Sequence, residues 1–200
     1  SKKISNILQK YLGPNICLFN HSCVYVNDPE LKKFKTSLDI HTDVWTGNSI
    51  DSIQLVTFIT DSDKNNSINF YPGSHLLGLL PVKNRVLDET RFKLNIKPFA
   101  LNNILAGDAV IFHPLLLHSS VKRTINKTLR VSIGDRLKSL DIKFSNQEKG
   151  LGYKVVNNGP LNHIKRIIGN DYLEPLRVYG GKHSFSKINE GYSLAKGYSI

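Results

Sequence analysis

The chain has 200 residues, of which 40% are hydrophobic and 22% charged. These values are typical of one globular domain with a real core, and they argue against a disordered or fibrous chain. No apolar run approaches the roughly 20 residues of a membrane-spanning helix, and no N-terminal stretch reads as a signal peptide. We therefore expect a cytoplasmic protein with no membrane partner.

The formal net charge is +11, which favours an anionic partner such as a phosphorylated small molecule. The basic residues are dispersed, and no nucleic-acid-binding motif is recognisable, so nucleic acid is not the expected partner. The two cysteines, Cys17 and Cys23, are too few for a disulfide framework or a zinc site and are expected to be reduced.

The first half of the chain begins with an apolar stripe at helical spacing over residues 4–12, which predicts an amphipathic helix ending at Gly13-Pro14. Residues 16–26 are rich in β-branched and aromatic types and predict a strand. Residues 27–37 are polar and predict a surface loop. A further strand is expected to carry His41 and Asp43.

Later strands follow at short intervals. Residues 52–60 and 67–71 predict two strands joined by a polar turn, and the segment 109–113 follows a Gly-Asp turn. Residues 76–98 predict a long excursion beside the site, and 128–137 predict another strand. Many short strands with turn residues between them favour an all-β sandwich or barrel over repeated βαβ units.

The last part of the chain, residues 138–200, is expected to be an extension of a single domain spanning 1–200. Pro160 and Gly169 bound a predicted short helix. The Gly-, Ser- and Tyr-rich tail that follows is expected to cover the site or to make a subunit contact, so a homodimer stays open.

A histidine and an aspartate two residues apart, His41 and Asp43, share one face of an extended strand. A distant third ligand, from His113 or His118, would complete a 2-His-1-carboxylate set for non-haem Fe(II). Arg130 lies inside an apolar strand, where a buried cation requires a partner, and its guanidinium suits a carboxylate co-substrate.

Four segments carry a resemblance to a known family: "LDIHTDVW", "SINFYPGSHLLG", "AGDAVIFHPLLLHSS" and "NKTLRVSIGDRL", over about residues 38–137. In order and content they resemble the phytanoyl-CoA dioxygenase family of Fe(II)/2-oxoglutarate oxygenases. The resemblance implies a double-stranded β-helix (a jelly-roll, cupin-like all-β core with a few flanking helices). It also implies Fe(II) with 2-oxoglutarate and O₂ as co-substrates.

The family pattern implies that His41, Asp43 and His118 are the metal ligands, since its distal ligand is the second histidine, in H-x-S. The pattern also implies that Ser120 and Arg130 bind the distal carboxylate of 2-oxoglutarate, with Arg123 as the rival arginine. Related halogenases lack the carboxylate ligand, so the presence of Asp43 favours hydroxylation.

Other candidates carry open alternatives. Gln54 and Thr57 are candidates to reach the 1-carboxylate end of 2-oxoglutarate. Trp45 either lines the substrate cavity or belongs to the core, and His75 either fixes the loop beside the metal or contacts substrate. The remaining histidines are expected to be ordinary: His21, His163 and His183.

The expected function is a 2-oxoglutarate-dependent dioxygenase that hydroxylates a small, anionic or zwitterionic molecule. Two alternatives remain: an oxygenase acting on a protein side chain or nucleic-acid base, and a non-enzymatic, cupin-type ligand-binding barrel.

Overall fold

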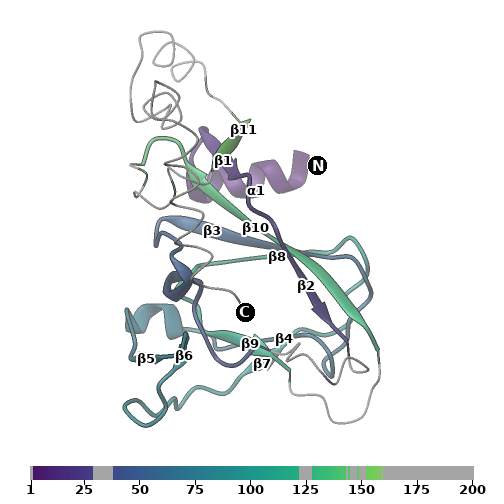
Figure 1. Cartoon of the computed structure of the whole chain (residues 1–200). Coiled ribbons are helices and arrows are strands. Elements are labelled where there is room, and N and C mark those ends of the chain that lie inside the picture. Colours follow the sequence, from purple (N-terminus) through teal and green to yellow (C-terminus); the bar gives the residue numbers. More distant parts are fainter. Residues whose placement is uncertain are drawn as a thin grey trace, which may run out of the picture. The chain divides into compact units, whose positions relative to one another are not determined.

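The computed structural model describes residues 2–28, 38–121, 128–142, 144, 148, 152–157 and 159. These residues form mostly β-strands with a few short helices, as expected (Figure 1). Within this part of the chain, no helix is long and apolar enough to cross a membrane. The predicted helix at 160–169, the tail beyond it and most of the predicted loop at 27–37 lie outside the described residues, as do Arg123, His163 and His183.

The chain divides into two compact units, one of Ser1–His21 with Arg136–Ile200 and one of Ser22–Asp135. The boundary between them falls within strand β10 (Arg130–Ser139). All of the candidate site residues that the structure describes belong to the second unit.

The first unit contains helix α1 (Lys2–Leu12), which ends where Gly13 adopts a left-handed φ of 77°. The apolar stripe of α1 is buried at Leu8 and Leu12, as its spacing predicts. Strand β1 (Ile16–Phe19) pairs antiparallel with the last part of β10 and with β11 (Tyr153–Asn157). One buried cluster in the described part of this unit contains Cys17, Phe19, Leu140 and Phe144.

The second unit contains two larger sheets. In one, the first part of β10 pairs with β2 (Cys23–Asn27), while β3 (Ser52–Phe58) neighbours β10 and pairs with β8 (Ala109–Phe112). The other sheet contains β7, β4 and β9 in that order: Phe99–Ala100, Ile68–Phe70 and His118–Ser120.

Shorter elements complete the second unit. Two 3₁₀ helices, η1 (Asp43–Thr46) and η2 (Ser74–Leu77), carry or follow candidate residues. Strands β5 (Val82–Lys83) and β6 (Val86–Leu87) form a small hairpin.

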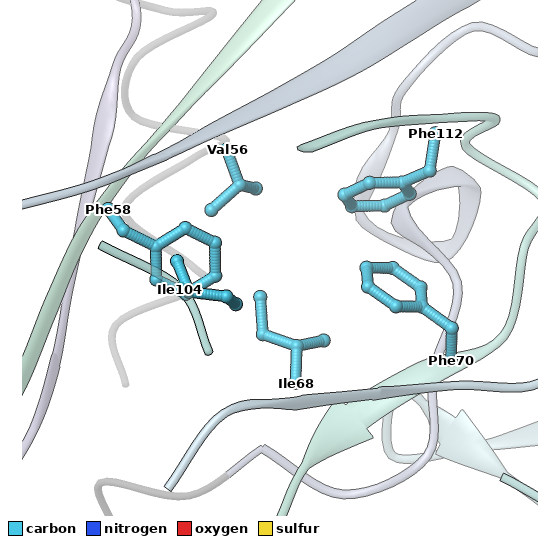
Figure 2. Close-up of a cluster of buried hydrophobic side chains, with 6 residues drawn as sticks. All are labelled: Val56, Phe58, Ile68, Phe70, Ile104 and Phe112. Atoms are coloured by element: carbon cyan, nitrogen blue, oxygen red, sulfur yellow. The ribbon is translucent and has the colours of Figure 1, made fainter. Parts of the chain in front are cut away.

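The core of the second unit lies between its two larger sheets. Burial alternates along β3, so that Val56 and Phe58 point inward. Figure 2 shows these side chains beside Ile68 and Ile104, with Phe70 of β4 next to Phe112. The Phe70 and Phe112 rings meet edge to face, with centroids 5.0 Å apart. This packing holds the strands that end beside the candidate site.

Most strand predictions are confirmed, with two differences. The stretch 16–26 forms two strands, because residues 20–22 leave the ladder. The strand predicted around His41 and Asp43 is wrong: His41 makes one isolated bridge, and Asp43 begins η1. Both cysteines are free.

Candidate metal centre

His41 and His118 face each other across a single antiparallel bridge. Each backbone N–H donates to the other residue's carbonyl oxygen at 3.0 Å. Residues opposite each other in an antiparallel pair place their side chains on the same face. The two imidazole centroids are accordingly 4.2 Å apart.

Asp43 joins the two histidines without a regular strand. Thr42, between His41 and Asp43, has extended dihedrals (φ −119°, ψ 151°), so the alternation that the sequence predicts is preserved over three residues. The Asp43 N–H donates to the Pro114 carbonyl at 3.0 Å, and the Thr46 hydroxyl donates to the Asp43 carbonyl at 2.7 Å. These bonds fix the backbone of Asp43 at the start of η1.

The three side chains converge. One nitrogen or oxygen atom from each of His41, Asp43 and His118 lies within 4.8 Å of the others, and the described residues contain no other such group of three. The His118 Nε2 is 3.8 Å from the Asp43 Oδ2, too long for a hydrogen bond. Two imidazoles and one carboxylate in this arrangement are the donor set that non-haem Fe(II) oxygenases use, with positions left open on the metal.

Backbone carbonyls fix the tautomer of both histidines. The His41 Nδ1 lies 2.7 Å from the Asp39 carbonyl oxygen, and the His118 Nδ1 lies 2.9 Å from the Leu116 carbonyl oxygen. Because a carbonyl oxygen only accepts, each Nδ1 carries the proton, which leaves the Nε2 lone pair for a metal.

Burial also keeps both imidazoles neutral. It lowers the pKa of His118 to about 4. Burial, with the neighbouring His118 as the second cause, likewise lowers the pKa of His41 to about 4. A neutral imidazole is the form that ligates a metal, so the residues present fit a divalent iron.

His113, the other candidate for the distal ligand, lies elsewhere. It is exposed, its Nδ1 accepts from the Leu115 N–H at 3.1 Å, and its ring lies 5.8 Å from that of His75. It belongs to no group of three metal-binding side chains in the described chain. The geometry therefore favours His118, as the family pattern implied.

Arg130 and Ser120 both lie inside the second unit. Arg130 is only 3% exposed, and its Nη1 donates to the carbonyls of Asn66 (3.1 Å) and Ser67 (2.5 Å). The Ser67 carbonyl also accepts from the Val121 N–H, so the guanidinium lies beside the end of β9 that carries Ser120. The Ser120 Oγ accepts from the Leu38 N–H at 3.0 Å, which leaves its hydroxyl proton for another acceptor.

Gln54 and Thr57 do not share a face of β3. Gln54 is on the buried face, opposite Phe112, whose ring is 4.9 Å from that of His118. Thr57 is on the half-buried opposite face, because the two residues are three positions apart and strand side chains alternate with period 2. Of this pair, Gln54 is the one that points toward the interior.

The Pro-Gly-Ser-His motif forms a turn that supports the metal centre. The Ser74 N–H donates to the Tyr71 carbonyl, and Gly73 has φ 83°, as the third position of a type II turn requires. The Ser74 Oγ accepts from the Leu117 N–H at 2.8 Å, directly before His118. Ser74 is thus the positioning residue of this motif, which the sequence analysis missed.

Trp45 packs in the core. It is half-buried against the cluster of Tyr71, Leu87 and Leu117, which favours the second of its two expected roles, a place in the core.

Asn66 is another residue that the sequence did not indicate. Its side chain bonds to Ser62, the Asp63 N–H and Thr128, and its carbonyl accepts from Arg130. Its position in an Asn-rich turn indicated a turn but not this contact.

Solved structures of similar fold are non-haem enzymes. One is "non-heme monooxygenase; ThoJ apo", with a TM-score of 0.59 and 15% identity, matching 96% of this chain and 74% of that one. A second is the epimerase SnoN in complex with Fe³⁺, α-ketoglutarate and nogalamycin RO (TM-score 0.56, 18% identity, 69% of this chain and 56% of that one).

A third is the α-ketoglutarate-dependent carbocyclase SnoK from nogalamycin biosynthesis (TM-score 0.51, 18% identity, 82% of this chain and 61% of that one). The chain spans less than two thirds of the length of SnoN, of SnoK and of a ThoJ–nickel complex, of which it matches 57%. At these identities the likeness concerns the fold.

A search of curated proteins finds no match. The family model of phytanoyl-CoA dioxygenase (PhyH) matches residues 3–128, which is more than half of the chain. The match includes His41, Asp43 and His118 together with the turn that supports them. The chain belongs to the phytanoyl-CoA dioxygenase family.

Proposed function

We propose that this protein is an Fe(II)- and 2-oxoglutarate-dependent dioxygenase that hydroxylates a small molecule. The observation that carries the proposal is the convergence of His41, Asp43 and His118, with both imidazoles neutral and both Nδ1 atoms hydrogen-bonded to backbone carbonyls. The two facing sheets of the second unit support a double-stranded β-helix.

His41, Asp43 and His118 would hold the iron. When bound, the iron with O₂ and 2-oxoglutarate supplies the oxidising chemistry: the co-substrate becomes succinate and CO₂, and one oxygen atom enters a C–H bond of the substrate. The protein's own contribution is to hold the three ligands in one tautomer and geometry, and to exclude water with apolar neighbours such as Phe70 and Phe112.

Arg130 and Ser120 would bind the 5-carboxylate of 2-oxoglutarate. The two carbonyl contacts of the Arg130 Nη1 orient the guanidinium, and a planar guanidinium presents two parallel donors to a carboxylate. Gln54 lies on the buried face of β3, opposite Phe112, which is a neighbour of His118. Its side chain would contact the 1-carboxylate end of 2-oxoglutarate. The Ser120 hydroxyl would add one donor.

The substrate is proposed to be a small anionic or zwitterionic molecule, on the grounds of the +11 net charge. Because proteins of similar fold include an epimerase and a carbocyclase, product analysis decides between hydroxylation and another oxidation. A mass increase of one oxygen atom would support hydroxylation, whereas an unchanged mass or a loss of two hydrogens would contradict it.

The test is succinate formation by purified protein supplied with Fe(II), ascorbate and 2-oxoglutarate, first alone and then with pools of small molecules. We expect slow, iron-dependent succinate release that substrate accelerates. The exposed variant Asp51→Ala should behave like the parent protein. Tight iron binding with no succinate under any condition would refute the dioxygenase and favour a ligand-binding barrel.

A further inference from the structure

The segment after the Pro-Gly-Ser-His turn exposes an unusual run of apolar side chains. Leu76 is 80% exposed and Leu79 is 72% exposed, and Leu77 and Val82 are each more than 40% exposed. Single exposed hydrophobic residues are ordinary, whereas four within seven residues of the chain are a concentration of the kind that marks an interaction surface. These four residues, called the apolar patch below, run from η2 to the start of the β5–β6 hairpin, whose strands are labelled in Figure 1.

A row of cations follows the apolar patch along the chain. Between residues 91 and 97 burial alternates, so that Phe92, Leu94 and Ile96 pack against the cluster around Leu87. The residues between them face solvent, and three of these four are basic: Arg91, Lys93 and Lys97. Side chains of one sign on the outer face of an extended segment form a charged stripe.

The β5–β6 hairpin adds two more exposed cations, Lys83 and Arg85. Asn84 and Arg85 have φ values of 52° and 64°, the geometry of a two-residue type I′ turn, which displays both side chains at the tip. Against these five cations the stretch 76–97 has two acids. One of them, Asp88, is buried and accepts from the Thr90 N–H and hydroxyl.

This segment is attached near the metal centre just before its start and again at its middle. The Ser74 Oγ, two residues before Leu76, accepts from the Leu117 N–H, next to His118. The Leu87 N–H donates to the Ile40 carbonyl at 2.8 Å, next to His41. The exposed leucines and the β5–β6 hairpin therefore lie between two points of attachment to the centre.

We propose that residues 76–97 bind an anionic lipid surface, with Leu76 and Leu79 inserted among the headgroups and the five cations paired with lipid phosphates. Exposed apolar side chains followed along the chain by Lys and Arg are the composition that peripheral membrane segments use. No membrane partner was expected from the sequence, but binding of this kind requires no membrane-spanning helix. The metal centre would then meet amphiphilic substrates at that surface.

The chemistry of the segment favours lipid over nucleic acid. Single-stranded nucleic acids stack their bases on aromatic rings. Phe92, the one aromatic residue in 76–97, packs inward. Exposed leucines offer bases no comparable partner, whereas they partition readily into a lipid interface.

The test is flotation of the full chain with vesicles of phosphatidylcholine alone and of phosphatidylcholine containing about 30% phosphatidylserine, at ~0.1 M salt. We expect binding to the anionic vesicles that weakens as salt rises. The double variant Leu76→Ser/Leu79→Ser should bind about tenfold more weakly. Each of Lys93→Gln and Lys97→Gln should weaken binding roughly fivefold.

Matched controls are Val24→Ser, which changes another exposed apolar side chain, and Lys64→Gln, which removes another exposed cation. Neither should change vesicle binding, and circular dichroism should show every variant folded. Iron-dependent succinate formation without vesicles should be unchanged in all variants, so failure of the lipid proposal leaves the proposed activity standing.

Four results would overturn the proposal. The first is absence of flotation with anionic vesicles. The second is equal binding by the segment variants and the control variants. The third is salt-sensitive binding of a single-stranded oligonucleotide that the leucine variants leave unchanged while vesicles fail to bind. The fourth is dissociation of a dimer by Leu76→Ser/Leu79→Ser in sedimentation, which would make the apolar patch a subunit contact.

Discussion

Each of the two compact units buries ionisable side chains, but one group is an ion pair and the other is a candidate metal centre. In the first unit, the Lys138 Nζ lies 2.9 Å from the Glu148 Oε2, and both side chains are at most 4% exposed. In the second unit, two neutral imidazoles and a carboxylate turn their ligand atoms toward one another. The first group neutralises its charge internally, whereas the second gathers acceptors around a point that suits a cation.

The surroundings of the two groups agree with this difference. Beside the Lys138–Glu148 pair, burial raises the pKa of the Cys17 thiol to about 12, and the thiol donates to the Lys138 carbonyl. In the second unit the backbone holds His41 and His118 with their Nε2 atoms unprotonated. Whether a buried polar cluster can bind a ligand therefore depends on whether its own donors and acceptors satisfy one another.

The largest expected effect is loss of metal from the second group. Asp43→Ala removes the only anionic ligand, and we expect metal affinity to fall by at least about 100-fold, with succinate formation lost. Calorimetry with Ni(II) or Mn(II) measures the affinity independently of turnover. Asp51→Ala is the control, since Asp51 is exposed and outside the triad. Unchanged metal affinity in Asp43→Ala would place the metal elsewhere.

The second prediction concerns the buried Lys138–Glu148 pair of the first unit. Glu148→Gln leaves the buried Lys138 without its carboxylate, and we expect the free energy of unfolding of the metal-free protein to fall by about 3–5 kcal/mol. Denaturant unfolding measures this change. The double variant Lys138→Met/Glu148→Met should recover much of it, and Glu89→Gln, at an exposed site, should change little.

These two variants test the comparison directly. Asp43→Ala should change metal binding far more than stability, and Glu148→Gln should change stability while the metal affinity of the folded protein stays constant. If Glu148→Gln loses metal without losing stability, the two groups do not act independently.

The third prediction concerns acid. His41 and His118, the two proposed metal ligands, have pKa values lowered to about 4 in the folded metal-free protein, against an ordinary value near 6.5 in the unfolded chain. Between these values the unfolded state binds more protons, so stability is full above pH 6.5 and falls as the pH drops toward 4. We expect a loss on the order of 5 kcal/mol between pH 7 and pH 4.5, to which the two histidines contribute about equally.

Denaturant unfolding with a chelator present, repeated at several pH values, measures this loss. His118→Gln removes one of the two titrating groups and should flatten the pH dependence by roughly half. A parent protein and a His118→Gln variant with the same slope between pH 6.5 and 4.5 would contradict the prediction.

The sequence predicts the triad better than it predicts what holds the triad. The spacing of His41 and Asp43 is compatible with one face of an extended segment, and Thr42 alone needs to be extended for that to hold. The strand inferred from it was wrong, because η1 begins at Asp43 through bonds to Pro114 and Thr46, which no local pattern reveals. The local sequence indicates which residues are the candidate ligands, whereas the contacts that hold those residues in place come from distant parts of the chain.

The positions of other site residues depend on which side chains are buried, and the sequence indicates burial only where apolar and polar residues alternate. The alternation of burial along β3 places Gln54 and Thr57 on opposite faces. The period of 2 in a strand predicts the same from the sequence. The Ser74 contact with Leu117 joins residues 43 positions apart, and the Lys138–Glu148 pair depends on packing within the first unit. The choice between His113 and His118 came from the family pattern and agrees with the geometry.

The smallest expected effect concerns the co-substrate. Arg130→Lys keeps the positive charge but replaces a two-pronged donor with a single ammonium, so we expect the Kd for 2-oxoglutarate to rise about 10–30-fold. Because the Arg130 Nη1 also bonds to the carbonyls of Asn66 and Ser67, the melting temperature should fall as well. A purely structural arginine would lower the melting temperature and leave the Kd of the folded protein unchanged. Calorimetry with 2-oxoglutarate on the Ni(II)-loaded protein separates these outcomes, with the exposed Arg91→Lys as the control.

Ser120→Ala, which removes one neutral donor, should raise the Kd for 2-oxoglutarate less than Arg130→Lys does. The reason is that hydrogen bonds from a charged donor are stronger than those from a neutral one.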